Sequence, residues 1–284
     1  MEGLLKISLL FFLVASLCAD VTYWDDSIIR PYVHHSELQR RWAMSFMAPH
    51  LKSLNGDESI LDVGCGDGKI SADLSCFVPK GKVVGIDLAE PMIHWATRQF
   101  YSNDYPNLSF QLGSFLDPQL EETFDVIVSF CALQHTSDQF KSLQSLFPYL
   151  KSNGKILILV PIRNNREWNQ ARLNIQNSEK WKPFYQGFPP RRMHSQEEYF
   201  QMAALAGFQN IEVLTHSTSD PFVDKKELVD WMIGTYPPMV PQNLIADFYS
   251  DWIEEYLRLR PDAITPEGVI YTYFGYFTLS ATRG

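Results

Sequence analysis

Apolar residues along the chain concentrate in short runs that are separated by stretches with helical spacing. Five of the runs have the length of strands and lie at residues 59–64, 81–89, 107–113, 124–130 and 155–161. Strands without polar alternation are typical of a sheet whose two faces are both covered. The pattern therefore predicts a mostly parallel sheet with helices on each side.

The intervening stretches have apolar residues at helical intervals. Residues 35–51 place Leu38, Trp42 and Phe46 four positions apart, and Ser36 is the expected N-cap of this helix. Pro91 stands at the first position of the next helix, where proline is tolerated. Four more helices are expected at residues 139–150, 195–207, 225–234 and 242–260.

The second half of the chain completes this architecture. Residues 162–195 are polar and aromatic, with several prolines, and are expected to form an insertion outside the sheet. Strands at 210–216 and 268–283 bring the expected total to seven. We expect an α/β, Rossmann-like, seven-stranded, mostly parallel sheet flanked by helices, with a helical cap over the carboxyl ends of the strands. The cap and substrate insertions are expected within residues 162–260 of one domain spanning 20–284.

The first 19 residues differ from the rest of the chain. An apolar or small stretch runs from Ile7 to Ala19 and is followed by Asp20, which is typical of a secretory signal peptide. The stretch is shorter than the roughly 20 residues that a membrane-spanning helix needs, so no stable span is expected. It suggests export, with a cytoplasmic location and an apolar packing helix as the alternatives.

Composition narrows the class of partner. The net charge is −9 and basic residues do not cluster, which argues against a nucleic-acid-binding surface. The four cysteines lack the spacing of a zinc site or a disulfide framework, and no metal is expected. We expect a monomer whose partner is a small molecule.

A glycine-rich loop follows the first strand, in the stretch LDVGCGDG. Gly64, Gly66 and Gly68 are spaced GxGxG, whereas the dinucleotide fingerprint is GxGxxG and would need glycine where Lys69 stands. Asp62 precedes the loop by two residues, and Asp87 ends the next strand. A carboxylate at Asp87 suits two ribose hydroxyls and would repel a phosphate.

These stretches resemble the first two motifs of the class I S-adenosylmethionine (SAM)-dependent methyltransferases. The resemblance implies SAM as cofactor, with Asp62 organising the loop or binding the SAM ammonium group, and with apolar side chains around the adenine. Ser114 stands where such enzymes commonly carry an aspartate. The implied cofactor contacts are Tyr32, Asp62, Gly64, Cys65, Gly66, Asp87, Leu88, Met92, Ser114, Phe115 and Phe130.

A closer resemblance, from Trp24 to Arg283, is to the trans-aconitate methyltransferases and, more loosely, to the insect juvenile hormone acid methyltransferases. It rests on stretches such as WDDSIIRPYVHHSELQ, CALQHTSD and GVIYTYFGYFTLSATR. It implies that a small organic carboxylate is converted to a methyl ester. His135, where the family usually has tryptophan, is the expected catalytic position. The expected acceptor contacts are Gln134, His135, Arg191, His194 and Trp231.

Three other functions stay open at this stage. One is a methyltransferase for another oxygen or nitrogen acceptor, and another is a SAM-binding protein without turnover. The third is a nicotinamide-dependent oxidoreductase, against which Lys69 and the missing third glycine count.

Overall fold

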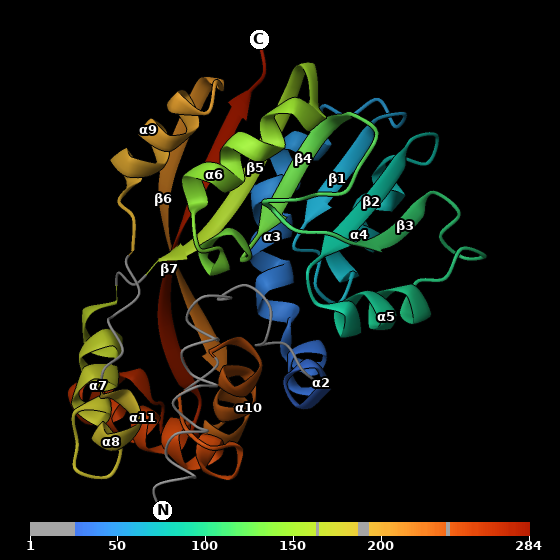
Figure 1. The fold of residues 1–284 in the computed structure, drawn as a ribbon. Coiled ribbons are helices and arrows are strands. Elements are labelled where there is room, and N and C mark those ends of the chain that lie inside the picture. The colour runs from blue at the N-terminus through green and yellow to red at the C-terminus, as the bar shows by residue number, and fades with distance from the viewer. Residues whose placement is uncertain (1–25, 163–164, 187–192, 237–238) are drawn as a thin grey trace, which may run out of the picture.

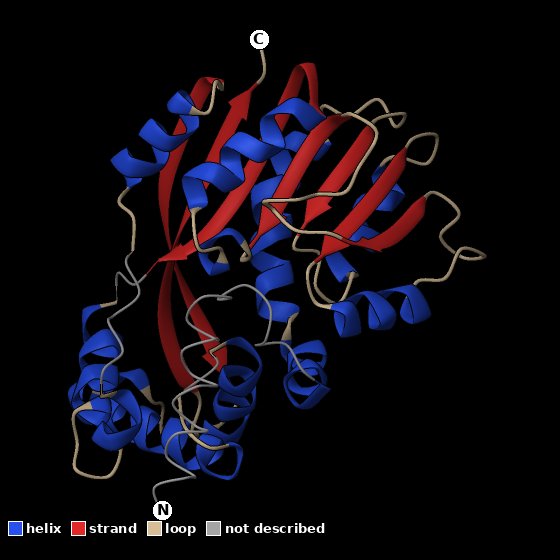
Figure 2. Ribbon diagram, in the orientation of Figure 1, coloured by secondary structure: helices blue, strands red, loops and turns tan. Residues whose placement is uncertain are grey.

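The computed structural model describes residues 26–162, 165–186, 193–236 and 239–284, which form a seven-stranded sheet with helices on both faces (Figures 1 and 2). The strand order is β3-β2-β1-β4-β5-β7-β6. β1 to β5 pair in parallel, whereas β7 is antiparallel to both of its neighbours. The strands are β1 (Ser59–Val63), β2 (Lys82–Asp87), β3 (Leu108–Leu112), β4 (Phe124–Phe130), β5 (Leu150–Ile162), β6 (Gln209–Phe222) and β7 (Ile270–Thr282). The predicted fold class is confirmed.

Two apolar cores lie on the opposite faces of the sheet. Ile60 and Val126 face the core that includes α3 (Glu37–Leu51) and α4 (Lys69–Phe77). Leu61 and Ile127 face the second core, with α6 (Gln139–Leu146) and α9 (Gln196–Leu205). Neighbouring residues of a strand point to opposite faces, so an unbroken apolar run supplies both cores.

The edge strand β3 departs from the expected burial. Of its five residues only Leu108 is buried, so the expectation that all five early strands are buried is wrong at this strand. β3 has one neighbouring strand, β2, and its outer side remains hydrated. α5 (Glu90–Gln99) packs beside it, with Pro91 at its second position, one residue later than predicted, because the helix begins at Glu90.

A helical layer lies beyond the carboxyl ends of the parallel strands, where β6 and β7 run past the rest of the sheet (Figure 1). The described residues of the 162–195 insertion include two helices, and the first of them, α7 (Arg166–Gln176), packs against α11 (Ile245–Leu259) through Trp168 and Trp252, whose ring centroids are 5.1 Å apart. The layer contains α2 (Asp26–His35), α7 (Arg166–Gln176), α8 (Lys182–Tyr185), α10 (Lys225–Thr235) and α11 (Ile245–Leu259).

Ser36 does not have the predicted role of a helix cap. The helix α2 directly precedes it, and its hydroxyl donates to the Asp67 carboxylate at 2.7 Å, while its oxygen accepts no backbone N–H from the start of α3. The local sequence pattern for a cap is present, but the Ser36 hydroxyl binds Asp67, which is distant in the sequence. Two other helix ends do follow local rules: Ser195 forms a capping box with Glu198, and Gly207, with a φ of +101°, follows the C-terminus of α9.

Short 3₁₀ turns connect several elements, namely η1 (Leu133–His135), η2 (Phe147–Tyr149), η3 (Gln242–Leu244) and η4 (Pro261–Ala263). Within the described residues, no helix has the length and apolar character needed to cross a membrane. The signal-like segment 1–19 lies outside the described residues.

Candidate functional site

The glycine loop between β1 and α4 is fixed to the neighbouring strand β2. The backbone N–H groups of Gly64 and Cys65 both donate to the Ile86 carbonyl, at 2.8 and 3.0 Å. Gly64 has a φ of +78°, and a Cβ added there would lie only 2.3 Å from the Cβ of Ala132. The close approach of the loop after β4 therefore requires glycine at this position.

Asp87, at the end of β2, holds the loop by a second connection. One carboxylate oxygen accepts from the Gly66 N–H and the other from the Ala89 N–H, each at 2.9 Å. Burial raises the pKa of Asp87, and these backbone N–H groups oppose that rise. Each oxygen keeps a lone pair with which it can accept from a further donor such as a sugar hydroxyl.

Asp62 is a second buried carboxylate on the adjacent strand. It is 2% exposed and accepts a hydrogen bond of 2.6 Å from the Ser71 hydroxyl. Burial, with smaller contributions from the charges of Asp87 and Asp67, raises the pKa of Asp62 to about 7. Burial of a carboxyl group with a raised pKa lowers the stability of the folded protein at neutral pH. Such groups are typical of functional sites.

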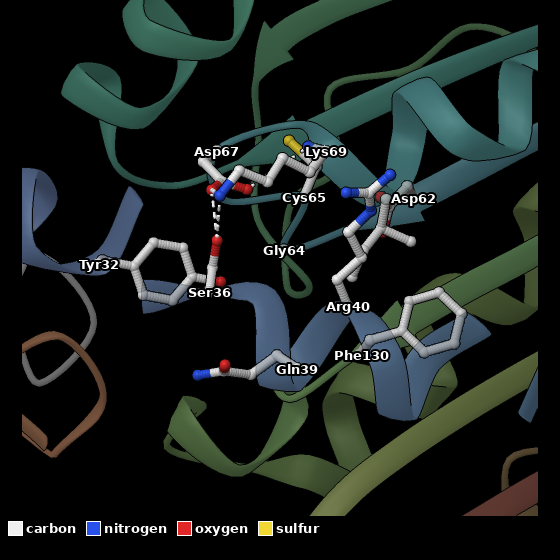
Figure 3. Close-up of a pocket in the computed structure, with 11 residues that line it drawn as sticks. Tyr32, Ser36, Gln39, Arg40, Asp62, Gly64, Cys65, Asp67, Lys69 and Phe130 are labelled. Carbon is white, nitrogen blue, oxygen red and sulfur yellow. Dashed lines mark hydrogen bonds and ion pairs between the residues drawn. The ribbon is translucent and has the colours of Figure 1, made fainter. Parts of the chain in front are cut away.

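The N-terminus of α3 is connected to the glycine loop by a polar cluster of Ser36, Asp67 and Lys69 (Figure 3). Lys69 Nζ donates to the Val33 carbonyl at 2.6 Å and to Ser36 Oγ at 2.8 Å, and lies 3.2 Å from Asp67. Tyr32 lies over Gly66, where an added Cβ would be 3.2 Å from the tyrosine hydroxyl. Burial, followed by the charge of Asp67, raises the pKa of Tyr32 well above its usual value.

These groups surround one pocket at the carboxyl ends of β1 and β4, with about 350 Å³ of empty space that includes its opening to solvent. Figure 3 shows the residues that line it, which are Tyr32, Ser36, Gln39, Arg40, Asp62, Gly64, Cys65, Asp67, Lys69, Ile70 and Phe130. Five of the predicted cofactor residues thus lie around one cavity, and Gly66 and Asp87 adjoin it through their hydrogen bond.

The other predicted cofactor residues lie around the end of β2 and the loop after β3. Leu88 is 38% exposed, whereas Met92 is 2% exposed and packs against Ile29 of α2. Ser114 closes a turn with Asp117 by two hydrogen bonds, and Phe115 is buried behind Gly64. Their contacts with the cofactor stay predictions.

The predicted acceptor residues do not gather in this pocket. Gln134 donates to the Cys131 carbonyl at 2.5 Å, and His135 ends the turn η1 after β4. His194 lies near Tyr199 of α9, with ring centroids 5.8 Å apart. Trp231 is buried behind the pocket, where its indole N–H donates to Gln39 at 3.4 Å. Arg191 lies outside the described residues.

Sequence reasoning missed six pocket residues, namely Ser36, Gln39, Arg40, Asp67, Lys69 and Ile70. The motif spacing makes Lys69 evidence against a dinucleotide, and the helix pattern gives Ser36 the role of a cap; neither pattern places them in the pocket. Ser36, Gln39 and Arg40 share a face of the chain because they lie three and four positions apart, which was the available signal. Their approach to the loop depends on how α3 packs.

Comparison with known proteins agrees with this geometry. Residues 54–226, more than half of the chain, match a family model described as a methyltransferase domain. Juvenile hormone acid O-methyltransferase of Bombyx mori is 24% identical over 249 residues, covering 81% of this chain and 86% of that protein. Trans-aconitate 2-methyltransferase of Deinococcus radiodurans is 27% identical, covering 62% of this chain and 68% of the relative.

Solved structures show the same fold. Phosphoethanolamine N-methyltransferase 2 of Haemonchus contortus in complex with S-adenosyl-L-methionine superimposes with a TM-score of 0.60 at 17% identity, covering 92% of this chain and 58% of that one. From the family match and the shared fold, the chain belongs to the methyltransferase domain family and is a SAM-dependent methyltransferase.

Proposed function

We propose that this enzyme transfers the methyl group of SAM to the carboxylate of a small organic acid and forms a methyl ester. One observation carries the proposal. The similarity to juvenile hormone acid O-methyltransferase covers 249 residues and is therefore longer than the matched domain, so it includes chain outside residues 54–226. The Deinococcus relative is likewise named for an organic acid.

We further propose that the pocket beside the glycine loop holds SAM. Its chemistry suits that molecule, because the buried carboxylates Asp62 and Asp87 offer acceptors to an ammonium group and to ribose hydroxyls. A carboxylate at Asp87 would also repel a phosphate group on the ribose. When bound, SAM supplies an activated methyl group.

The protein's part in the transfer is to orient the acceptor and exclude water. A carboxylic acid with a pKa of about 4 is already ionised at neutral pH, so no general base is needed. Tyr32 and Phe130 would cover the pocket from α2 and from the end of β4. Holding the acceptor close to the methyl group then supplies most of the rate enhancement.

The acceptor is tested with methyl-labelled SAM and a panel of organic acids. An ester product releases labelled methanol under mild base, which is the expected result. Base-stable label would contradict ester formation and assign the methyl group to nitrogen or to a phenol. A failure of SAM to bind would overturn both proposals in this subsection.

The Lys69→Met substitution is expected to raise the KM for SAM about tenfold and to change kcat by less than about twofold, because one charge-assisted hydrogen bond contributes about 1.5 kcal/mol. The hydrogen bonds that Lys69 donates to Val33 and Ser36 hold α2, and with it Tyr32, over the loop. Steady-state kinetics measure the effect. Ser36→Ala, which keeps the Lys69–Val33 bond, is the control and should be milder. An unchanged KM in the lysine variant would contradict this role.

Asp62→Asn is expected to stabilise the protein while weakening SAM binding. The folded-state pKa of Asp62, about 7, lies above its unfolded value, so the folded state loses stability as pH rises from about 4 to 7. The variant should therefore melt a few degrees higher than the wild type at pH 8, with little difference at pH 4.5. Thermal unfolding across this pH range measures the effect.

In the wild type, SAM binding should strengthen with rising pH, whereas folding stability should decrease. SAM affinity is expected to fall as the pH drops below 7 and Asp62 takes up a proton, and the Asp62→Asn variant should lack this dependence. Calorimetry at pH 6 and pH 8 tests it. Equal pH dependence in both proteins would show that another group titrates.

A further inference from the structure

One glycine of the helical layer, Gly234, lies inside a helix and not in a turn. It is the last residue but one of α10 (Lys225–Thr235), and it is buried with a helical backbone. Glycine inside a helix is less favourable than alanine, because it loses more conformational freedom when the chain folds. The reason for a glycine at this position therefore lies in its contacts.

Gly234 packs against the backbone of α2, which lies beside α10 in Figure 1. A Cβ added to Gly234 would lie 2.7 Å from the Cα and 2.8 Å from the N of Tyr32, and 3.1 Å from the carbonyl carbon of Pro31. These are backbone atoms, which cannot rotate away as the end of a long side chain can. Carbon atoms in contact lie about 3.5 to 4.0 Å apart, so a side chain at position 234 requires the two helices to separate by on the order of 1 Å.

The side chain of Tyr32 extends from α2 to the glycine loop. Its hydroxyl lies 3.2 Å from the position that a Cβ on Gly66 would take, so the ring covers the backbone of that residue. Lys69 also ties α2 to the loop, since it donates to the Val33 carbonyl at 2.6 Å. Because these contacts are already close, α2 has no room to move toward the loop. A methyl group on Gly234 therefore displaces Tyr32 from its place over Gly66.

α10 supports a second wall of the pocket from the same face. Trp231 precedes Gly234 by three positions and so lies on the same side of the helix, where its indole N–H donates to Gln39 at 3.4 Å. Tyr32 and Gln39 both line the pocket beside the glycine loop, as Figure 3 shows. Among the described residues, none from α10 lines that pocket. The helix acts on the pocket through the two helices that it touches.

We propose that Gly234 is a positioning residue for cofactor binding. Its lack of a side chain lets α10 pack against the backbone of Tyr32 and so keeps the tyrosine ring over the glycine loop. The proposal rests on the proposed SAM pocket and adds to it a residue from outside the pocket. In enzymes, a displacement of about 1 Å in the groups that hold a reactant costs up to about 100-fold in rate.

The test is a double-mutant cycle of Gly234→Ala and Tyr32→Ala, with the Kd for SAM measured by calorimetry. Gly234→Ala is expected to raise the Kd at least tenfold in the wild-type background, because the ring of Tyr32 leaves its position. In the Tyr32→Ala background the same change should alter the Kd by less than about twofold, since no ring remains to be displaced. A glycine with only a structural role would lower stability without this dependence on Tyr32.

Gly56→Ala is the matched control. Gly56 precedes β1, at the amino ends of the parallel strands, whereas the pocket lies at their carboxyl ends. It has a φ of +94°, and no atom lies nearer than 3.6 Å to an added Cβ. The substitution should lower stability through the backbone alone and leave the Kd for SAM within about twofold.

Hydrogen exchange of the wild-type protein is a second measurement, and it decides the matter if Gly234→Ala does not fold. Saturating SAM should slow amide exchange in α2 and α10 together, because the two helices are held as one unit. Slower exchange in α2 with no change in α10 would overturn the proposal.

Two results of the cycle would also overturn it. One is a folded Gly234→Ala protein whose Kd for SAM stays within about twofold of the wild type, and the other is an equal increase in both backgrounds. In both cases the wild-type protein still binds SAM, so SAM binding stands and only the role of Gly234 is wrong. A wild-type protein that binds no SAM would instead overturn the proposed SAM pocket, and the role of Gly234 with it.

Discussion

Asp87→Ala is expected to raise the Kd for SAM at least 100-fold. The carboxylate accepts the N–H groups of Gly66 and Ala89, so its removal releases the glycine loop and deletes the proposed ribose acceptor. Two hydrogen bonds to a charged group contribute about 3 kcal/mol or more together, which corresponds to a factor of about 100 in affinity. Calorimetry at pH 7.5 measures the change.

A matched control separates this effect from a general loss of carboxylates. Glu122 is exposed and pairs with Lys82, the first residue of the same strand β2, at the end remote from the pocket. Glu122→Ala should leave SAM affinity within about twofold, since an exposed ion pair contributes less than about 1 kcal/mol. Tight SAM binding by a folded Asp87→Ala protein would refute the proposed role of Asp87.

Gly64→Ala is expected to lower the free energy of unfolding by on the order of 3 kcal/mol, the sum of an overpacking cost and a backbone cost. The new Cβ would lie 2.3 Å from the Cβ of Ala132, and the residue has a φ of +78°. Chemical denaturation measures the loss.

Two variants separate the contributions. Ala132→Gly combined with Gly64→Ala should recover the overpacking part, because it removes the atom that clashes. Gly268→Ala isolates the backbone part, since Gly268 has a φ of +92° and no atom within 4 Å of an added Cβ. It should cost about 1 kcal/mol. A Gly64→Ala protein as stable as the wild type would contradict the close contact.

Position 64 requires glycine for two reasons, one visible in the sequence and one only in the structure. The motif indicated a glycine that lets the backbone approach a ligand. The fold supplies another requirement, because the loop after β4 crosses within van der Waals contact of Gly64. The sequence position of Ala132 carries no sign of this, since the two residues meet only when β1 and β4 pair.

Local patterns predicted local structure well. The strands and the helix that contains Pro91 each depend on residues within a few positions of one another. Predictions failed where a residue's role depends on another part of the chain that is distant in sequence. Ser36 bonds to Asp67 instead of capping α3, and the exposure of β3 follows from its place at the sheet edge.

The α/β class, the position of the glycine loop and the two acidic residues near the strand ends could be predicted from the sequence, because hydrophobic period, turn chemistry and motif spacing are local properties. That Lys69 connects α2 to the loop, that Trp231 lies behind the pocket beside the glycine loop, and that Gly234 packs against Tyr32 became visible only in the folded chain. These groups are far apart in the chain, and side-chain packing alone brings them together. No local pattern encodes which distant surfaces meet.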